Sequence, residues 1–378
     1  MKVIVAPDSF KGSLSGKEVC EAVTIGIHAY DSDIEVQSIP IADGGEGTAE
    51  AFTTILGGQL ISERVEDPLG RPVDASFGWV EETKTAIVET AAASGLPLLQ
   101  QGELNPYKAS TYGTGQLITA ALDHGAEQII LGLGGSATVD AGSGCFQALG
   151  VKFLDQEGGE MKMNGGALRH VSKIDTSQID RRAQNVQWLI ASDVTNPLLG
   201  KQGAISVFGP QKGVQEEDIP AFETGMEHYA DLLETATGAT YQSKDGSGAA
   251  GGFGFTLYAL LKHVRVESGF TLMARLGELE SRMRDADLVI TGEGKIDEQT
   301  LYGKGPIGIA RLAKEIGVPC VGFAGKMQGD LTRLKDEGLL SVLPIVEEPV
   351  TLEEAMQSSS MLLQHASKRC MEVYHLNR

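Results

Sequence analysis

The chain has 378 residues, too many for one ordinary hydrophobic core, so we expect two domains. Its composition, 42% hydrophobic and 22% charged, is typical of a folded globular protein and excludes a disordered chain. The formal net charge of −20 excludes a broad basic surface for nucleic acid or anionic membranes. An anionic ligand must therefore be held by a local site.

The sequence shows no cysteine motif, signal peptide or membrane-spanning segment. The four cysteines lie far apart and form no CxxC pair, so neither a zinc site nor a disulfide framework is indicated. No signal peptide is recognisable, and no apolar run reaches the roughly 20 residues that a membrane span needs. We therefore expect a soluble, cytoplasmic protein that binds neither nucleic acid nor membrane.

Six apolar runs typical of β-strands each end at a short polar loop. In chain order the first loop residues are Asp8, Asp43, Gly134, Asp193, Glu293 and Lys326. In open α/β sheets, ligands bind outside the carboxyl ends of the strands, and glycine lets the backbone approach them closely. We therefore expect these loops to form the active site.

Amphipathic helices alternate with these runs. Their expected positions are 16–30 after the Ser15/Glu18 capping box, 48–56, 115–124, 143–149, 306–316 and 352–373. The regular alternation at the two ends predicts a doubly wound (Rossmann/flavodoxin-like) parallel-sheet domain of residues 1–72 plus 286–378. The less regular middle, 73–285, predicts a second α/β domain inserted into the first, with the active site in the interdomain cleft.

The segment from Gly132 to Ala137 matches the GxGxxG/A dinucleotide fingerprint and follows an apolar run. No helix starts cleanly inside it, because two more glycines follow between Thr138 and Gly144. We favour a phosphate-cradling loop over nicotinamide binding, and a purely structural turn stays open. Neither a Walker A motif nor protein-kinase signatures occur.

Carboxylates beside strand ends and glycines point to a metal-assisted reaction. They are Asp43, Glu46, Asp140, Asp193, Glu293 and Asp297. Helix capping could explain one or two of them but not six. Carboxylate oxygens suit Mg²⁺, which usually binds one or two carboxylates plus substrate phosphates, as phosphoryl transfer requires. Lysines beside the same loops could neutralise a phosphate or a substrate carboxylate: Lys11, Lys212, Lys295 and Lys304. No histidine is assigned a role.

Eight ordered motifs over the whole chain resemble those of the bacterial type I glycerate kinase family. They are APDSFKGSLS (6–15), PIADGGEGT (40–48), YGTGQLI (112–118), LGLGGSAT (131–138), ASDVTNPLLG (191–200), VFGPQKG (207–213), GAAGGFG (248–254) and TGEGKIDEQT (291–300). The resemblance implies phosphorylation of D-glycerate with ATP and Mg²⁺, commonly to 2-phosphoglycerate. Val139, Ala141 and Lys295 depart from the family pattern.

Glycerate and ATP together suggest roles for the loop residues. For the glycerate carboxylate and hydroxyls we expect Asp8, Ser9, Asp43 and Arg71. Asp193 is expected to act as the general base or as a metal-positioning carboxylate, and Lys11 is the second expected catalytic residue. For the nucleotide we expect Thr114, Gly115, Gly134, Gly135, Ser136 and Lys212. Glu293 and Asp297 are the expected metal ligands.

Two other functions stay open at this point. An NAD-dependent hydroxyacid dehydrogenase would need a helix at Gly134 to Ala137. A non-catalytic organic-acid binding protein is disfavoured by the six acidic loops, because their carboxylates would repel an anionic ligand unless Mg²⁺ lay between them. The sequence does not fix the phosphorylated hydroxyl, and it leaves the oligomeric state open, a homodimer included.

Overall fold

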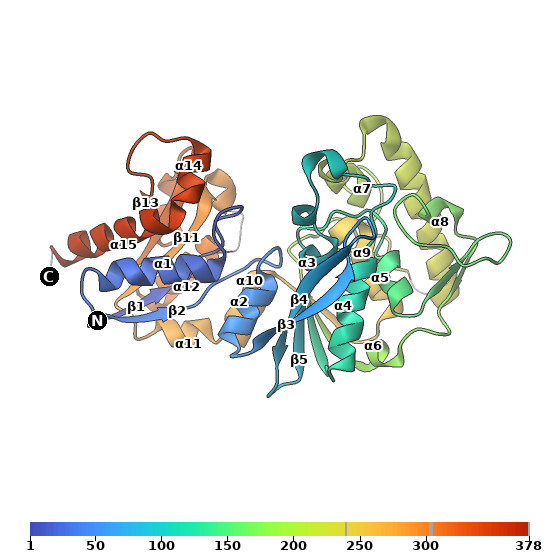
Figure 1. The fold of residues 1–378 in the computed structure, drawn as a ribbon, viewed down its shortest axis with the longest axis horizontal. Coiled ribbons are helices and arrows are strands. Elements are labelled where there is room, and N and C mark those ends of the chain that lie inside the picture. Colours follow the sequence, from blue (N-terminus) through green and yellow to red (C-terminus); the bar gives the residue numbers. More distant parts are fainter. Residues whose placement is uncertain (239, 302–304, 377–378) are drawn as a thin grey trace. The chain divides into compact units, whose positions relative to one another are not determined.

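A computed structural model describes residues 1–238, 240–301 and 305–376. The chain divides into two compact units (Figure 1). Unit 1 comprises Met1–Asp43, Glu50–Gly57 and Ser268–Arg378, and unit 2 comprises Gly44–Ala49 and Gly58–Glu267. The first boundary lies before the expected 72/73, because the strand at 59–66 pairs with the strand at 72–80 inside unit 2. The second lies at 267/268 and not at the expected 285/286.

Unit 1 contains a five-stranded sheet with the order β13-β12-β11-β1-β2, and all its neighbouring strands are parallel. The strands are β1 (Lys2–Val5), β2 (Glu35–Ser38), β11 (Leu288–Ile296), β12 (Cys320–Met327) and β13 (Leu339–Pro344). The helices are α1 (Gly16–His28), α10 (Gly269–Leu276), α11 (Leu279–Met283), α12 (Pro306–Ile316), α13 (Thr332–Asp336), α14 (Leu352–Gln357) and α15 (Ser359–His375). The doubly wound parallel sheet expected from the sequence is confirmed.

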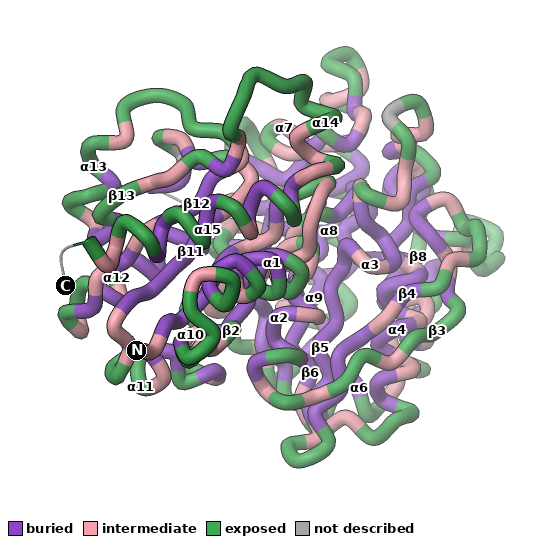
Figure 2. The backbone as a smooth tube through the Cα atoms, turned by 60° about the vertical axis from the view of Figure 1, so that its left-hand side comes forward, coloured by how far each residue is buried: buried purple, intermediate pink, exposed green. Residues whose placement is uncertain are grey.

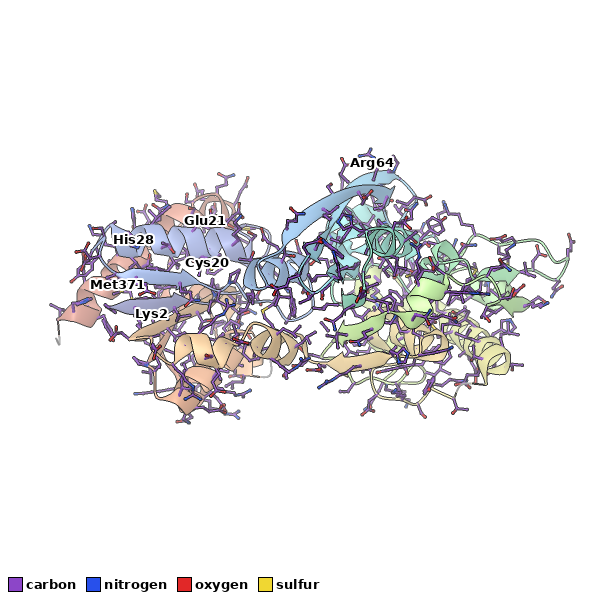
Figure 3. The ribbon with its side chains drawn as sticks, turned by 90° about the horizontal axis from the view of Figure 1, so that it is seen from below. Lys2, Cys20, Glu21, His28, Arg64 and Met371 are labelled. Atoms are coloured by element: carbon purple, nitrogen blue, oxygen red, sulfur yellow. The ribbon has the colours of Figure 1, made fainter. Side chains whose placement is uncertain are left out.

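Helices cover both faces of this sheet, as a parallel sheet requires. Val3 and Val5 pack against α1 and α15 on one face, while Ile4 is equally buried on the other. Strand β11 is mostly buried as well, and most of it is purple in Figure 2. Gly26 lets α1 and α15 approach, since a Cβ there would lie 2.2 Å from the carbonyl oxygen of Gln364. In Figure 3 the labelled residues of α1 include Cys20, which is buried, and Glu21, which is exposed.

Unit 2 contains a six-stranded sheet with the order β10-β9-β6-β5-β4-β3. Its strands are β3 (Gln59–Glu66), β4 (Pro72–Val80), β5 (Thr85–Glu89), β6 (Gln128–Gly132), β9 (Gln187–Ala191) and β10 (Val264–Glu267). From β5 to β10 the neighbours are parallel, whereas β3, β4 and β5 form antiparallel pairs. A two-stranded sheet pairs β7 (Lys152–Leu154) with β8 (Lys173–Asp175).

The helices of unit 2 enclose a core centred on Trp79, Trp188 and Tyr229. They are α3 (Thr90–Ser94), α4 (Tyr112–Asp123), α5 (Ser143–Ala148), α6 (Arg181–Asn185), α7 (Ala204–Phe208), α8 (Ile219–Thr237) and α9 (Ala249–Leu260). Short 3₁₀ helices lie at 96–98, 101–103, 168–170, 210–212 and 216–218, with another in unit 1 at 298–301. Helix α2 (Thr48–Ile55) begins in unit 2 and continues in unit 1.

Two helices differ from the sequence-based expectation. The single helix expected at 352–373 is two helices, α14 and α15, separated at Ser358. Helix α4 begins at Tyr112, one turn before the expected Gly115. Within the described ranges, no helix combines the length and the hydrophobicity needed to cross a bilayer.

Candidate active site

A pocket of about 510 Å³ lies at the carboxyl ends of the unit 1 strands. Its lining comes from the loop after β1, from Asp43, from the ends of β11 and β12, and from the α14 region. Strand β1 leads through α1 to β2, whereas β11 leads through α12 to β12, so the chain winds outward in both directions from the β1–β11 pair. Such a topological switch point is where open α/β sheets bind ligands.

Three carboxylates interact at this pocket. Asp8 follows β1, Glu293 lies near the end of β11, and both line the pocket together with Asp43. The pKa of Asp8 is raised to about 7, first by burial and then by the negative charges of Asp43 and Glu293. A backbone hydrogen bond from Ser9 opposes part of this rise. The Ser9 amide donates to Asp8 Oδ1 at 2.6 Å. Close carboxylates of this kind favour a divalent cation, which would relieve their repulsion.

The lysines of the pocket have different surroundings. Burial raises the pKa of Glu293 as well as that of Asp8, and the positive charge of Lys11 opposes both rises. Lys295 Nζ lies 2.5 Å from Asp297 Oδ2 in an ion pair, and it lines the pocket together with Lys326. Lys304, which the sequence suggested as a fourth cation, lies outside the described residues.

The expected metal ligands Glu293 and Asp297 lie on adjoining segments of unit 1. Glu293 Oε1 accepts a hydrogen bond of 2.9 Å from Thr300 Oγ1, and the same hydroxyl accepts from the Asp297 amide at 3.1 Å. Among the described residues, no group of three or more His, Cys, Asp or Glu could hold a metal ion by itself. This donor set fits Mg²⁺, which takes one or two carboxylates and completes its shell with water and substrate phosphates.

A second, smaller cavity of about 200 Å³ lies in unit 2, next to the loop after β6. Gly134, Gly135, Ser136 and Lys212 line it, so the structure brings these four predicted residues together. Gly135 has φ +72, and in the described part of the chain the amides of Gly135 and Ser136 have no hydrogen-bond acceptor. Free amides in such a turn form an anion-binding nest.

Lys212 is a buried cation in the wall of this cavity. Its side chain belongs to the 3₁₀ helix 210–212 and is only 2% exposed. The ammonium donates to Ser136 Oγ and to the Thr138 carbonyl oxygen, both at 2.8 Å. Burial lowers the pKa of Lys212 to about 7, although the nearby charge of Asp140 opposes this shift.

Asp193, the expected general base, follows β9 and is exposed. Its neighbour Val194 lines the unit 2 cavity. The exposed carboxylate is therefore next in sequence to a residue of the cavity wall. A role as general base stays a proposal.

Three predicted binding residues lie elsewhere in unit 2. Thr114 and Gly115 are buried in α4, not in the wall of the Gly134 cavity: the Thr114 hydroxyl donates to Ser94 Oγ, and Gly115 packs against the Cys145 carbonyl. Helix packing accounts for these two residues. Arg71 is already paired, because its guanidinium contacts Asp67 and Glu103, each at 2.6 Å.

Asp140 is structural, although its sequence position resembled that of a ligand-facing carboxylate. It is fully buried and accepts hydrogen bonds from the Thr111 amide and hydroxyl, both at 2.8 Å, and from the amides of Gly142 and Gly144. Asp140 therefore fastens the start of α4 to the start of α5. Burial is the main cause that raises its pKa.

Sequence reasoning missed Glu89, at the end of β5. Its Oε2 accepts a hydrogen bond of 2.9 Å from the Ala49 amide in the first turn of α2. Burial raises the pKa of Glu89 to about 7, although backbone amides of 47–49 stabilise the charged form. The position of Glu89 directly after an apolar run could have identified it from the sequence.

The loop after β6 does not have the geometry of a dinucleotide-binding motif. The segment from Gly134 to Gly142 contains no helix, and α5 begins only at Ser143. A dehydrogenase fingerprint needs a helix that starts inside the glycine motif. The nicotinamide alternative therefore has no structural support here.

Comparison with known proteins identifies the family. The sequence pattern of the glycerate kinase family matches residues 3–375. The chain is 43% identical to a glycerate kinase of Bacillus subtilis (strain 168), over 97% of this chain and 96% of the relative. It is 42% identical to a glycerate 2-kinase of Escherichia coli (strain K12), over 95% and 94%. The chain belongs to the glycerate kinase family.

A solved structure of the same family has the same fold. A crystal structure of a protein assigned as glycerate kinase 2 from Salmonella typhimurium LT2 matches with a TM-score of 0.86 and 39% identity. The match covers 100% of this chain and 99% of that one. This glycerate kinase family member is therefore an enzyme that transfers a phosphoryl group to an alcohol.

The departures from the glycerate kinase pattern have structural explanations. Ala141 has φ +54, the left-handed region in which glycine is unstrained, so its side chain is accommodated at some conformational cost. Val139 is buried in the core of unit 2. Lys295 lines the unit 1 pocket, which keeps a positive charge at that position.

Proposed function

We propose that this enzyme uses ATP and Mg²⁺ to phosphorylate D-glycerate on its 2-hydroxyl group. The observation that carries the proposal is the set of Asp8, Asp43 and Glu293 at the switch point of the unit 1 sheet, with Lys11 beside them. Preference for the 2-hydroxyl is supported by the name of the Escherichia coli relative, glycerate 2-kinase.

Phosphoryl transfer depends mainly on positioning and on neutralisation of charge. The glycerate oxygen forms a bond to the γ-phosphorus while the bond from that phosphorus to the bridging oxygen of ADP breaks. Mg²⁺, when bound, neutralises charge on the phosphate oxygens. One or two of the carboxylates of Asp8, Asp43 and Glu293 would hold it, with water and phosphate oxygens completing its shell. Lys11 would bind a phosphate oxygen. The carboxylate of Asp193 would accept the proton of the attacking hydroxyl.

The product and its dependence on each component test this function. Purified enzyme with ATP, Mg²⁺ and D-glycerate should release ADP and 2-phosphoglycerate, identified by the phosphorus NMR signal and its proton coupling. Omitting glycerate or chelating Mg²⁺ should abolish ADP release. A 3-phosphoglycerate signal would overturn the choice of hydroxyl, and equal ADP release without glycerate would overturn the function itself. Because ATP is the donor, we place the enzyme in the cytoplasm.

A further inference from the structure

We infer that the two units divide the two substrates: the unit 1 pocket binds the nucleotide, and the unit 2 cavity binds the glycerate carboxylate. This assignment rests on the proposed function. It reverses the roles expected from the sequence, which gave the glycine loop at 134–136 to the nucleotide and the loop at Asp8 to glycerate.

The sizes of the two pockets differ in the direction that this assignment requires. The unit 1 pocket has about 510 Å³ and the unit 2 cavity about 200 Å³. Sites for ligands of drug size occupy about 300–1,000 Å³. An adenine nucleotide belongs to that size class, whereas a three-carbon acid is far smaller. The unit 2 cavity could enclose glycerate but not a whole nucleotide.

The unit 1 pocket has an apolar wall suited to a flat base. Leu352, Ala355 and Met356 of α14 line it, together with Ile345 and Val346. Leu352 is 76% exposed although it lines this pocket, so its side chain is available to a ligand. A methionine thioether beside an aromatic ring is a favourable contact. Neither glycerate nor a metal ion would use such a wall.

The wall is attached firmly to the polar end of the same pocket. Ser13, in the loop after β1, donates from Oγ to the Met356 carbonyl oxygen and also bonds the Ser359 hydroxyl, both at 2.8 Å. Lys11 lies in the same loop, and Lys295 and Lys326 lie at the ends of β11 and β12. A nucleotide with its base on α14 would therefore find cations for its phosphates and the Asp8 carboxylate for a bound metal ion.

The unit 2 cavity offers what a small carboxylate needs. Gly135 and Ser136 present free amides, and the Lys212 ammonium provides a buried positive charge. Two of the three ammonium protons are bound by Ser136 Oγ and the Thr138 carbonyl. Within the described residues the third has no acceptor, so a ligand carboxylate can take it.

Two substitutions separate the two halves of the assignment. Leu352→Asp places a negative charge on the base-binding wall at an exposed position, so folding should be unaffected. We expect the KM for ATP to rise about tenfold or more, the effect of losing about 1.4 kcal/mol, with the KM for glycerate unchanged. Ser136→Ala should raise the KM for glycerate and leave that for ATP unchanged. Leu376→Asp is the matched control, since Leu376 is 80% exposed and lines neither pocket.

Calorimetric titration of the whole protein with Mg²⁺–ADP tests nucleotide binding without catalysis. Leu352→Asp should weaken this binding by the same factor, while Ser136→Ala and Leu376→Asp should not change it. Weakened ADP binding in Ser136→Ala with normal binding in Leu352→Asp would overturn the assignment. That result would leave the proposed function intact, because phosphorus NMR would still detect phosphoglycerate. Failure of the wild-type enzyme to form phosphoglycerate would instead reject the function, and the ADP titration would still decide the nucleotide site.

Discussion

Lys212 Nζ donates a 2.8 Å hydrogen bond to Ser136 Oγ and thereby joins the 3₁₀ helix 210–212 to the glycine loop after β6. The two residues lie 76 positions apart in the chain. A buried ammonium held by a hydroxyl and a carbonyl, with no carboxylate of the described residues bonded to it, costs stability. Such a cost is expected where the charge serves a ligand.

The pKa of Lys212 predicts how the stability of the protein depends on pH. Its folded value of about 7 is below the value of 10.5 for a free lysine, so the unfolded chain binds more protons between these pH values. Stability should therefore rise with pH across this window in the wild type. In Lys212→Met this contribution disappears. The Tm of the wild type minus that of the variant should therefore increase as the pH rises from 7 to 9.5.

Thermal unfolding of both proteins at several pH values measures this effect. Lys201→Met, which removes an exposed lysine of the same unit, should follow the wild type. Parallel Tm curves for wild type and Lys212→Met would contradict a depressed lysine pKa.

Asp8 should control the acid side of the pH–rate profile. Its pKa is about 7, and the charge of Asp43 is one cause. If the charged form of Asp8 is needed, kcat/KM should fall as the pH drops below about 7. Asp43→Asn removes a neighbouring negative charge, so the pKa of Asp8 should decrease and the acid limb should move to lower pH. The exposed Asp33→Asn is the control. If the acid limb of the pH–rate profile has the same midpoint in Asp43→Asn as in the wild type, a group other than Asp8 controls it.

Asp193→Asn tests the proposed general base. The amide keeps the shape of the side chain but cannot accept the hydroxyl proton. We expect kcat to fall by about 10²-fold or more, with little change in the KM for glycerate. Retention of more than half of the wild-type kcat would show that Asp193 only shapes the turn after β9.

Asp140→Asn should affect stability and not the chemistry. Asparagine would turn an NH₂ group toward donors at Thr111, Gly142 or Gly144, leaving a buried group unsatisfied. The expected loss is about 2 kcal/mol in the free energy of unfolding. At low temperature, where the variant is folded, it should keep most of the wild-type kcat. Asp155→Asn, at an exposed turn, should lose much less. Full stability with a large loss of kcat would place Asp140 in the reaction.

Local patterns were sufficient to predict much of the fold, and they also indicated the strand-end loops that line the candidate site. The apolar runs before Asp8, Glu293 and Lys326 become β1, β11 and β12, because short, β-branched apolar runs are typical of strands buried on both faces of a parallel sheet. The capping boxes at Ser15 and Thr351 form as expected, because both partners lie within four residues. From a parallel sheet it follows that these loops meet at one edge.

The tertiary structure decided which polar residues a ligand can reach. Asp140 and Asp193 looked alike in sequence, yet one is fully buried among amides from Thr111 and Gly144 and the other is exposed. Burial depends on segments distant in the chain, which no local pattern encodes. The same holds for Thr114, enclosed by helix packing. The depressed pKa of Lys212 likewise arises from burial by the whole unit, so only the folded chain creates it.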